Sequence, residues 1–272
     1  ADDLARSITG SGTYSIKDSD ANIAGLAAAK FTGKAITITN EATVDHLATI
    51  SAKSGVIDYT KLTDTAAKIA GSLSYIKKDV AVKINTEAEA KEAADIDARV
   101  AAVSATLTLT TVTDTAAKLA GNTSALKSRI VKLKGGEVSN AANYKTIVEA
   151  LPSSFSGAVV DDVSALTHGK TLTLTGATSV TAKLQGNGSD KDLSTVKLDS
   201  KVTEIDLNAQ AATLDADDLT NATVKLSGGS YQVKDSASSV AGLTTSLFKD
   251  KVVVLTGEVD ITNLGIVKKD AT

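Results

Sequence analysis

The sequence contains no cysteine, no methionine and no tryptophan, and its aromatic residues are limited to three phenylalanines and five tyrosines. Without cysteine, the chain forms no disulfide, no thiolate metal site and no thiol nucleophile. The lack of both sulfur-containing residues also removes the side chains that oxidise most readily, which favours a location outside the cell. So few aromatic residues provide hardly any surface on which nucleic-acid bases could stack.

Strong charge of one sign and long apolar runs are absent as well. The net charge is −3, and the charged residues are scattered without a basic stripe, so we expect no nucleic-acid partner. No apolar run approaches the roughly 18 residues of a spanning helix, so we expect no membrane span. The 272 residues, 42% of them apolar, are enough for a buried core in one or two domains. A start at Ala1, without an initiator methionine or a signal peptide, predicts a processed product or an excised fragment.

Two decamers are nearly the same: LTDTAAKIAG at 62–71 and VTDTAAKLAG at 112–121. Two weaker relatives are YSIKDSDANIAGL at 14–26 and YQVKDSASSVAGL at 231–243. Alignment of the four segments gives an aspartate column, an apolar column and a glycine column: Asp18, Asp64, Asp114 and Asp235; Ile23, Ile69, Leu119 and Val240; Gly25, Gly71, Gly121 and Gly242. One aspartate per repeat argues against catalysis, because an active site brings different residues together once. We expect these aspartates to cap helices.

A second motif follows each of these segments. Its copies are KAITITNEATVDHL at 34–47, VAVKINTEAEAKEA at 80–93, RIVKLKGGEVSNAA at 129–142 and KVVVLTGEVDITNL at 251–264. The distance from the aspartate to the strand-like centre is 18 residues to Ile36, 18 to Val82, 17 to Val131 and 18 to Val253. A spacing that is held four times predicts a two-part structural repeat.

The two motifs predict alternating short strands and short helices. Segments such as ITIT, VAVKI and VVVL are β-branched and alternate, which is typical of strands. DTAAKIAG begins with good capping residues. Thr86 and Glu89 have capping-box spacing in a clearer helix, whose inner face would hold Ala88, Ala93 and Ile96. Strands joined by helical crossovers are parallel, and repeats that cannot bury their apolar faces alone must stack.

The pattern changes near residue 151, where LPSSFSGAVV contains the single proline. Short strand candidates with little helical pattern follow, separated by glycine, asparagine and aspartate. We therefore predict a strand–short-helix repeat domain at 1–150 and a β-rich repeat domain at 151–272, which ends in another copy of the two-part repeat. The predicted fold class is a β-rich, solenoid-like α/β repeat. Short parallel strands alternate with short helices in the first half, and the second half is mostly β, as a β-solenoid or a sandwich-like stack.

Three segments resemble repeats of large secreted bacterial surface proteins: Asp64–Ala70, Asp114–Ala120 and ITITNEATVDHL at 36–47. Such proteins include surface-layer (S-layer) proteins and type I-secreted, adhesin-like proteins of Gram-negative bacteria. The resemblance implies an extracellular structural role at the bacterial cell surface, self-assembly into a lattice and, in some members, calcium dependence. The chain lacks the GGxGxDxLx nonapeptides of one calcium-binding subgroup.

Calcium is the one ligand that the sequence leaves open. Asp190 and Asp192 lie in the turn GNGSDKD, and Asp215, Asp217 and Asp218 lie in LDADDLTN. Closely spaced aspartates supply the oxygen ligands that calcium prefers, although neither segment fits an EF-hand loop. A solvated turn or a helix cap is the simpler interpretation of both segments.

No catalytic constellation is recognisable. The two histidines, His46 and His168, have no partners that spacing places beside them, and no G-x-S-x-G or P-loop motif is present. We therefore expect no enzyme. The leading hypothesis is a structural, extracellular segment of a self-assembling bacterial surface layer or secreted array, with other copies of itself as partners.

Two alternatives remain. The first is an adhesin module that binds carbohydrate or lipopolysaccharide along a repeat face. It is disfavoured because Tyr14, Tyr59 and Tyr231 lie at strand starts, where they resemble core edges more than sugar platforms. The second and weaker alternative is a polysaccharide-acting β-solenoid enzyme, which would need carboxylates gathered in one groove.

Overall fold

The computed structural model describes residues 14–30, 32–136, 138–151, 155–167, 174, 176–184, 191–194, 196–220 and 225–270. The chain divides into two compact units, Ala1–Lys134 and Gly135–Thr272. The domain boundary expected from sequence, between residues 150 and 151, falls inside the second unit. In the described part of the chain, no helix is both long and apolar enough to cross a membrane.

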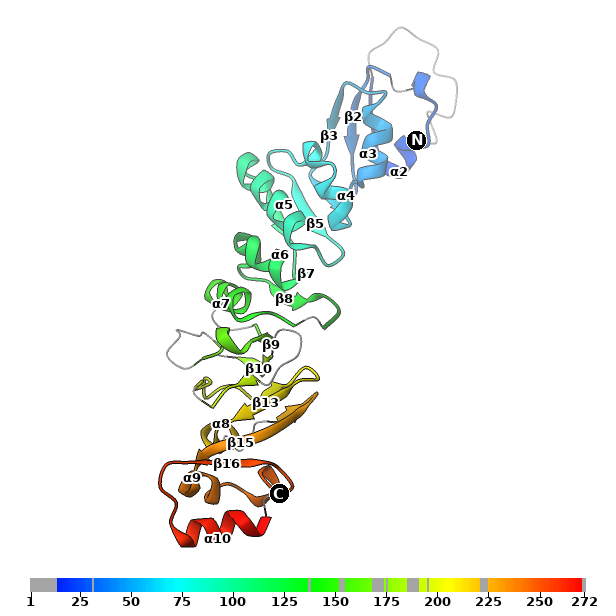
Figure 1. The fold of residues 1–272 in the computed structure, drawn as a ribbon. Helices are drawn as coiled ribbons and strands as arrows, with labels where there is room; N and C mark the ends of the chain where they lie inside the picture. Colours follow the sequence, from blue (N-terminus) through cyan, green and yellow to red (C-terminus); the bar gives the residue numbers. More distant parts are fainter. Residues whose placement is uncertain are drawn as a thin grey trace. The chain divides into compact units, whose positions relative to one another are not determined.

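Strands and helices alternate along the first unit (Figure 1). Its strands are β1 (Ser15–Asp18), β2 (Ala35–Ile38), β3 (Val56–Asp58), β4 (Lys61–Asp64), β5 (Ala81–Ile84), β6 (Thr106–Thr108), β7 (Thr111–Asp114) and β8 (Ile130–Leu133). Its α-helices are α2 (Asp20–Ala24), α3 (Val44–Ser51), α4 (Ala66–Ala70), α5 (Ala90–Val103) and α6 (Ala116–Gly121). Its 3₁₀ helices are η1 (Ala28–Lys30), η2 (Leu73–Tyr75) and η3 (Thr123–Leu126), and η4 (Lys134–Gly136) spans the division between the units.

The described strand pairs of the first unit are parallel, and partners lie about 20 residues apart in the chain. Ser15 pairs with Ala35, for example, and Lys61 pairs with Ala81. The sheets have the strand orders β1-β2-β3, β4-β5-β6 and β7-β8. The prediction of short parallel strands that alternate with short helices is confirmed.

One nearly continuous strand closes each sheet and opens the next. β3 pairs with β2, whereas β4, which begins after Tyr59 and Thr60, pairs with β5. Within this short break the Thr60 carbonyl already accepts the N–H of Ala81 in the next sheet. β6 and β7 make the same switch between their two sheets.

The second unit begins with a helix and continues with short strands. Its helices are α7 (Ala141–Ala150), α8 (Ala216–Thr220), α9 (Ala237–Ala241) and α10 (Ile261–Asp270), with 3₁₀ helices η5 (Val163–Ala165) and η6 (Thr245–Leu247). Its strands are β9 (Gly157–Asp162), β10 (Ala177–Lys183), β11 (Lys191–Asp192), β12 (Glu204–Asp206), β13 (Ala211–Leu214), β14 (Lys225–Ser227), β15 (Ser230–Ser236) and β16 (Val253–Thr256). Helices α9 and α10 lie in the expected final copy of the two-part repeat, whereas α8 adds a short helix to the segment before it.

From β10 to β15 the chain visits two sheets in strict turn. β10, β12 and β14 belong to a sheet of order β14-β12-β10-β9, whereas β11, β13 and β15 belong to a sheet of order β11-β13-β15-β16. All pairs within these two sheets are parallel. Because β-sandwiches are built from antiparallel sheets, this pairing is against the sandwich-like alternative. The described strands form no closed barrel.

In β2, β4, β5 and β7, alternate residues face the core. In β4 the side chains of Leu62 and Asp64 are buried, whereas Lys61 is exposed and Thr63 is half-buried. Helix α3 covers such a face with Val44, Leu47 and Ile50, which follow one another at helical spacing. Parallel sheets are usually covered on both faces, whereas these sheets keep one polar face. The core therefore lies between the sheets and their short helices.

Candidate functional site: the repeat joint and an acidic pocket

Consecutive repeats meet through the same backbone contact, which we call the joint. In the first joint, Ala42 pairs in parallel with Leu62, donating its N–H to the Lys61 carbonyl and accepting the N–H of Thr63, both at 2.9 Å. The joint pairs are Ala42–Leu62, Ala88–Val112, Ser139–Val159 and Leu214–Val233. In the first three joints, the segment that leaves one repeat and the strand that enters the next are thus held by a two-bond ladder, whereas Leu214–Val233 is the last pair of the longer β13–β15 pairing.

An aspartate near the end of each incoming strand closes the N-terminus of the preceding helix. The Asp64 Oδ2 accepts the N–H of Val44, the first residue of α3, at 3.0 Å, and its Oδ1 accepts the N–H of Thr65 at 2.8 Å. The same link joins, at 2.9 to 3.1 Å, Val44–Asp64, Ala90–Asp114, Ala141–Asp161 and Ala216–Asp235. Each carboxylate satisfies one backbone donor in each of two neighbouring repeats.

This geometry corrects the capping roles that the sequence suggested. Asp64 caps the helix before it, and α4 is capped by the next residue, Thr65, whose Oγ1 accepts the N–H of Lys68. The N-caps of the corresponding short helices are Ser19, Thr65, Thr115 and Ser236. Asp161 joins the column although its sequence, GAVVDD, lacks the repeat signature.

The capping box of α5 also differs from the prediction. Glu89 is the N-cap and pairs with Glu92, which accepts the N–H of Glu89 at 3.0 Å. The Thr86 Oγ1 instead accepts the N–H of Ala66, the first residue of α4. Ala88, expected inside the helix, is the joint residue.

Buried joint carboxylates have cationic neighbours. Asp114 is completely buried, and the Lys118 Nζ lies 3.4 Å from its Oδ1. The hydrogen bond to Asp114, followed by the charges of Asp114 and Glu89, raises the pKa of Lys118. The Lys68 Nζ lies 3.8 Å from the corresponding Asp64. A lysine therefore balances the charge that two of the joints bury.

The three tyrosines at strand starts have a common structural role. Each donates its hydroxyl to a backbone carbonyl 16 residues further on, in the pairs Tyr14–Lys30, Tyr59–Tyr75 and Tyr231–Leu247. A lysine ammonium lies 4.3 to 5.0 Å from each ring centre, in the pairs Lys34–Tyr14, Lys77–Tyr59 and Lys251–Tyr231. Rings held in this way are not the open platforms that sugar sites use.

His46 takes part in a polar cluster that sequence spacing did not reveal. Its Nδ1 lies 2.7 Å from the Oδ2 of Asp20, which is almost fully buried and also accepts the N–H and hydroxyl of Thr43. Burial alone would raise the pKa of Asp20, but hydrogen bonds from Asn40, His46 and Thr43 outweigh it and lower that pKa. The cluster links α2 to α3 and needs no catalytic role to explain it. His168 lies outside the described residues.

The predicted calcium candidates do not converge. Asp190 lies outside the described residues, and Asp192 is bound to the Lys234 Nζ at 2.8 Å, which together with Ser194 lowers its pKa to about 2. In the described part of the chain, no group of three or more His, Cys, Asp or Glu is arranged to hold a metal ion. Calcium binding at Asp190, Asp192, Asp215, Asp217 and Asp218 stays a prediction.

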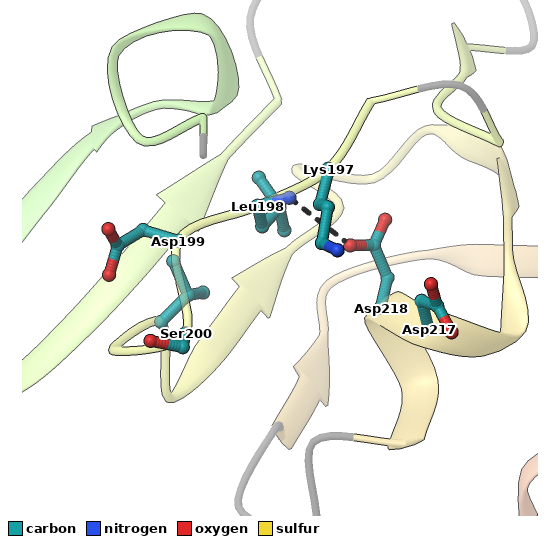
Figure 2. Close-up of a pocket in the computed structure, with 7 residues that line it drawn as sticks. Lys197, Leu198, Asp199, Ser200, Asp217 and Asp218 are labelled. Carbon is teal, nitrogen blue, oxygen red and sulfur yellow. Dashed lines mark hydrogen bonds between the residues drawn. The ribbon is translucent and has the colours of Figure 1, made fainter. Parts of the chain in front are cut away.

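Two of these aspartates line a pocket of about 290 Å³ beside α8 (Figure 2). The Asp218 carboxyl group is directed toward the segment 197–200, where its Oδ1 accepts the N–H of Leu198 at 3.5 Å. Its Oδ2 is buried without a hydrogen-bond partner. Asp215 accepts the N–H of Asp218 at 2.7 Å. Asp217 lines the pocket beside Asp218, and Asp199 points away from it.

Burial dominates the acid–base properties of this pocket. Burial first, and the charge of Asp215 second, raise the pKa of Asp218 from 3.8 to about 7. Burial also raises the pKa of Asp215. The lining contains no histidine or cysteine. The other ionisable residues that line the pocket are Lys197, Asp199 and Asp217.

Comparisons of the chain with protein-family models, curated proteins and solved structures gave no match.

Proposed function

We propose that this protein is a structural, extracellular segment of a self-assembling bacterial surface layer or secreted surface array. The observation that carries the proposal is the joint: its carboxylate link recurs four times, and its parallel backbone pair is an isolated bridge in three joints and the end of the β13–β15 pairing in the fourth. In a chain of equivalent units joined by equivalent contacts, each repeat is stabilised by its neighbours. Such a chain can be extended unit by unit, which suits a scaffold.

We further propose a solenoid-like stacking of the repeats. Supporting this are the parallel partners about 20 residues apart, the strands shared between successive sheets and the strict alternation of the chain between two sheets from β10 to β15. Each turn of such a solenoid adds one strand to each sheet it visits.

Electron microscopy of the concentrated protein tests this function. The proposal predicts regular arrays or filaments under at least one condition, and a series with and without divalent cations asks whether calcium contributes. Dispersed single particles under every condition would contradict it. The carbohydrate-binding alternative gains no support from the tyrosines, since their hydroxyls are bonded within the chain.

A further inference from the structure

The segment around α10 repeats the outgoing half of a joint. Asp260 precedes α10 and accepts the N–H of Asn263 at 2.8 Å, as Asn140 before α7 accepts the N–H of Asn143. Helix α10 packs on α9 as α3 packs on α2. Val259 therefore corresponds to the joint residue Ala42, and Ile261 corresponds to Val44, the first residue of its helix.

No incoming strand covers this surface within the described residues. Val259 is 40% exposed, whereas its counterparts, Ala42, Ala88, Ser139 and Leu214, are fully buried. Ile261 is 89% exposed, whereas its counterparts, Val44, Ala90, Ala141 and Ala216, are at most 7% exposed. Leu264 is 43% exposed, whereas Leu47, Ala93, Tyr144 and Leu219 are buried. The equivalents of Val259, Ile261 and Leu264 are buried in all four joints, whereas these three side chains are exposed together. An exposed apolar cluster of this kind is typical of interaction sites.

We propose that β1 of a second copy of this chain occupies the surface formed by Val259, Ile261 and Leu264, so that copies associate head to tail. This inference rests on the proposed function and specifies its contact. The occupant is defined by the four interior joints: a parallel strand with an apolar residue two positions before an aspartate, as in Leu62 and Asp64.

The strand β1 has this pattern at Ile16 and Asp18, followed by Ser19 as the helix cap. Among the described strands, it lies at the edge of the sheet β1-β2-β3. The Asp18 carbonyl faces inward and accepts the N–H of Thr39, as the Asp64 carbonyl accepts that of Asn85. Backbone groups of successive strand residues point to opposite edges, so the Ser15 carbonyl and the Lys17 N–H face outward. In the first joint, the equivalent groups are the Lys61 carbonyl and the Thr63 N–H, which bond to Ala42.

The carboxylate link can also form. Asp18 accepts the N–H of Ser19 through Oδ1, as the interior aspartates accept the N–H that follows them. Asp18 also accepts the side-chain amide of Asn22 at 2.9 Å and has a further partner, so the N–H of Ile261 would replace one of these bonds when β1 docks.

Charge complementarity favours this occupant. In the first two joints, the glutamate before the joint residue accepts the hydroxyl of a threonine on the incoming strand, in the pairs Glu41–Thr63 and Glu87–Thr113. At the uncovered surface the glutamate is Glu258, and the residue of β1 in the threonine position is Lys17. Both side chains are exposed. Docking of β1 would therefore place opposite charges where the interior joints have a neutral hydrogen bond.

Because the two surfaces differ, the contact is heterologous and extends into open chains unless the rotation closes a ring. Sedimentation velocity over a concentration series tests this. The wild-type protein is expected to form oligomers of increasing size. Ile261→Glu is expected to weaken association by more than about tenfold, because it places a carboxylate in the apolar joint. The monomer should stay folded by circular dichroism, because an acidic residue suits the first turn of a helix.

Ile266→Glu is the matched control. Ile266 is also 43% exposed on α10, but its counterparts at the sixth helical position, Thr49 and Thr146, stay exposed in complete joints. Its replacement is therefore expected to leave association unchanged. Glu258→Lys and Lys17→Glu should each weaken association roughly three- to tenfold, and the double variant, with the charges exchanged, should recover it.

The outcomes separate the contact from the function. If the wild type assembles but Ile261→Glu and Ile266→Glu weaken association equally, the head-to-tail contact is wrong and the proposed function stands. The same conclusion follows if the double charge exchange does not restore association. A wild-type chain that stays monomeric over the whole series overturns both.

Discussion

At the scale of single residues, the aspartate at the end of a strand holds two repeats together. Asp114 lies in a fully buried position and accepts backbone N–H groups from Ala90 and Thr115. The sequence could show that such aspartates recur and that they suit helix N-termini. It could not show which helix each one closes, because the bonded donor lies 19 to 24 residues earlier in the chain.

Replacement of Asp114 by alanine tests this role. Two N–H groups lose their acceptor in a buried place, so the free energy of unfolding should fall by roughly 2 to 4 kcal/mol. Urea denaturation followed by circular dichroism measures the change. Asp45→Ala is the control, because the Asp45 side chain is 69% exposed and, within the described residues, pairs with the exposed Lys68, so it should change stability by less than about 0.5 kcal/mol. Equal effects of the two replacements would contradict the link.

Asp218 predicts a pH dependence of stability. Its pKa in the folded protein, about 7, lies above the ordinary 3.8, so folding favours the protonated carboxyl group. The corresponding stability is complete below the ordinary value and is lost as the pH rises through about 7. Asp215, whose pKa is also raised, acts in the same direction.

Asp218→Asn should remove most of this dependence. We expect the wild-type free energy of unfolding to fall by roughly 1 to 3 kcal/mol between about pH 4 and pH 8, and that of the variant to fall much less. Urea titrations at several pH values measure both. Asp217→Asn, at an exposed position of the same helix, should reduce the slope only slightly, because the charge of Asp217 is the smallest contribution to the raised pKa of Asp218. The sequence could not predict this behaviour, because LDADDLTN resembles a solvated turn and the burial of Asp218 comes from the distant segment 197–200.

At the scale of elements, the short helices depend on contacts with the strands. Helix α4 has five residues, too few to be stable alone. The sequence predicted its apolar spacing and a cap at its start, but it assigned the cap to Asp64 rather than to Thr65. It did not predict η2, which follows and is fixed by the hydroxyl of Tyr59 bonded to the Tyr75 carbonyl.

Tyr59→Phe tests this anchor. The replacement keeps the ring beneath Lys77 but leaves the Tyr75 carbonyl without its donor, so stability should fall by about 1 kcal/mol. Burial, and secondarily the neighbouring Tyr75, also raises the pKa of Tyr59. An ultraviolet titration of the folded protein should therefore show Tyr59 ionising only above the ordinary pH range of a tyrosine. A replacement without effect on stability, or early ionisation, would contradict the anchor.

At the scale of the whole molecule, the sequence predicted the repeat, the parallel strands and the alternation with helices, because hydrophobic periodicity and fixed spacing are local properties. It did not predict the repeat at Asp161, whose motif has diverged, nor the exposure of Ile261. The exposure of Ile261 depends on which strand covers the helix, and that is not a local property of the sequence.

The most direct test of the account is amide hydrogen exchange, resolved by residue, as a function of protein concentration. The first residues of α3, α5, α7 and α8 donate to an aspartate one repeat further on, so their amides should be protected at every concentration. The Ile261 amide should exchange freely in dilute solution and become protected as the protein is concentrated. An Ile261 amide that stays unprotected in assembled protein, or that is already protected in the dilute monomer, would contradict the account.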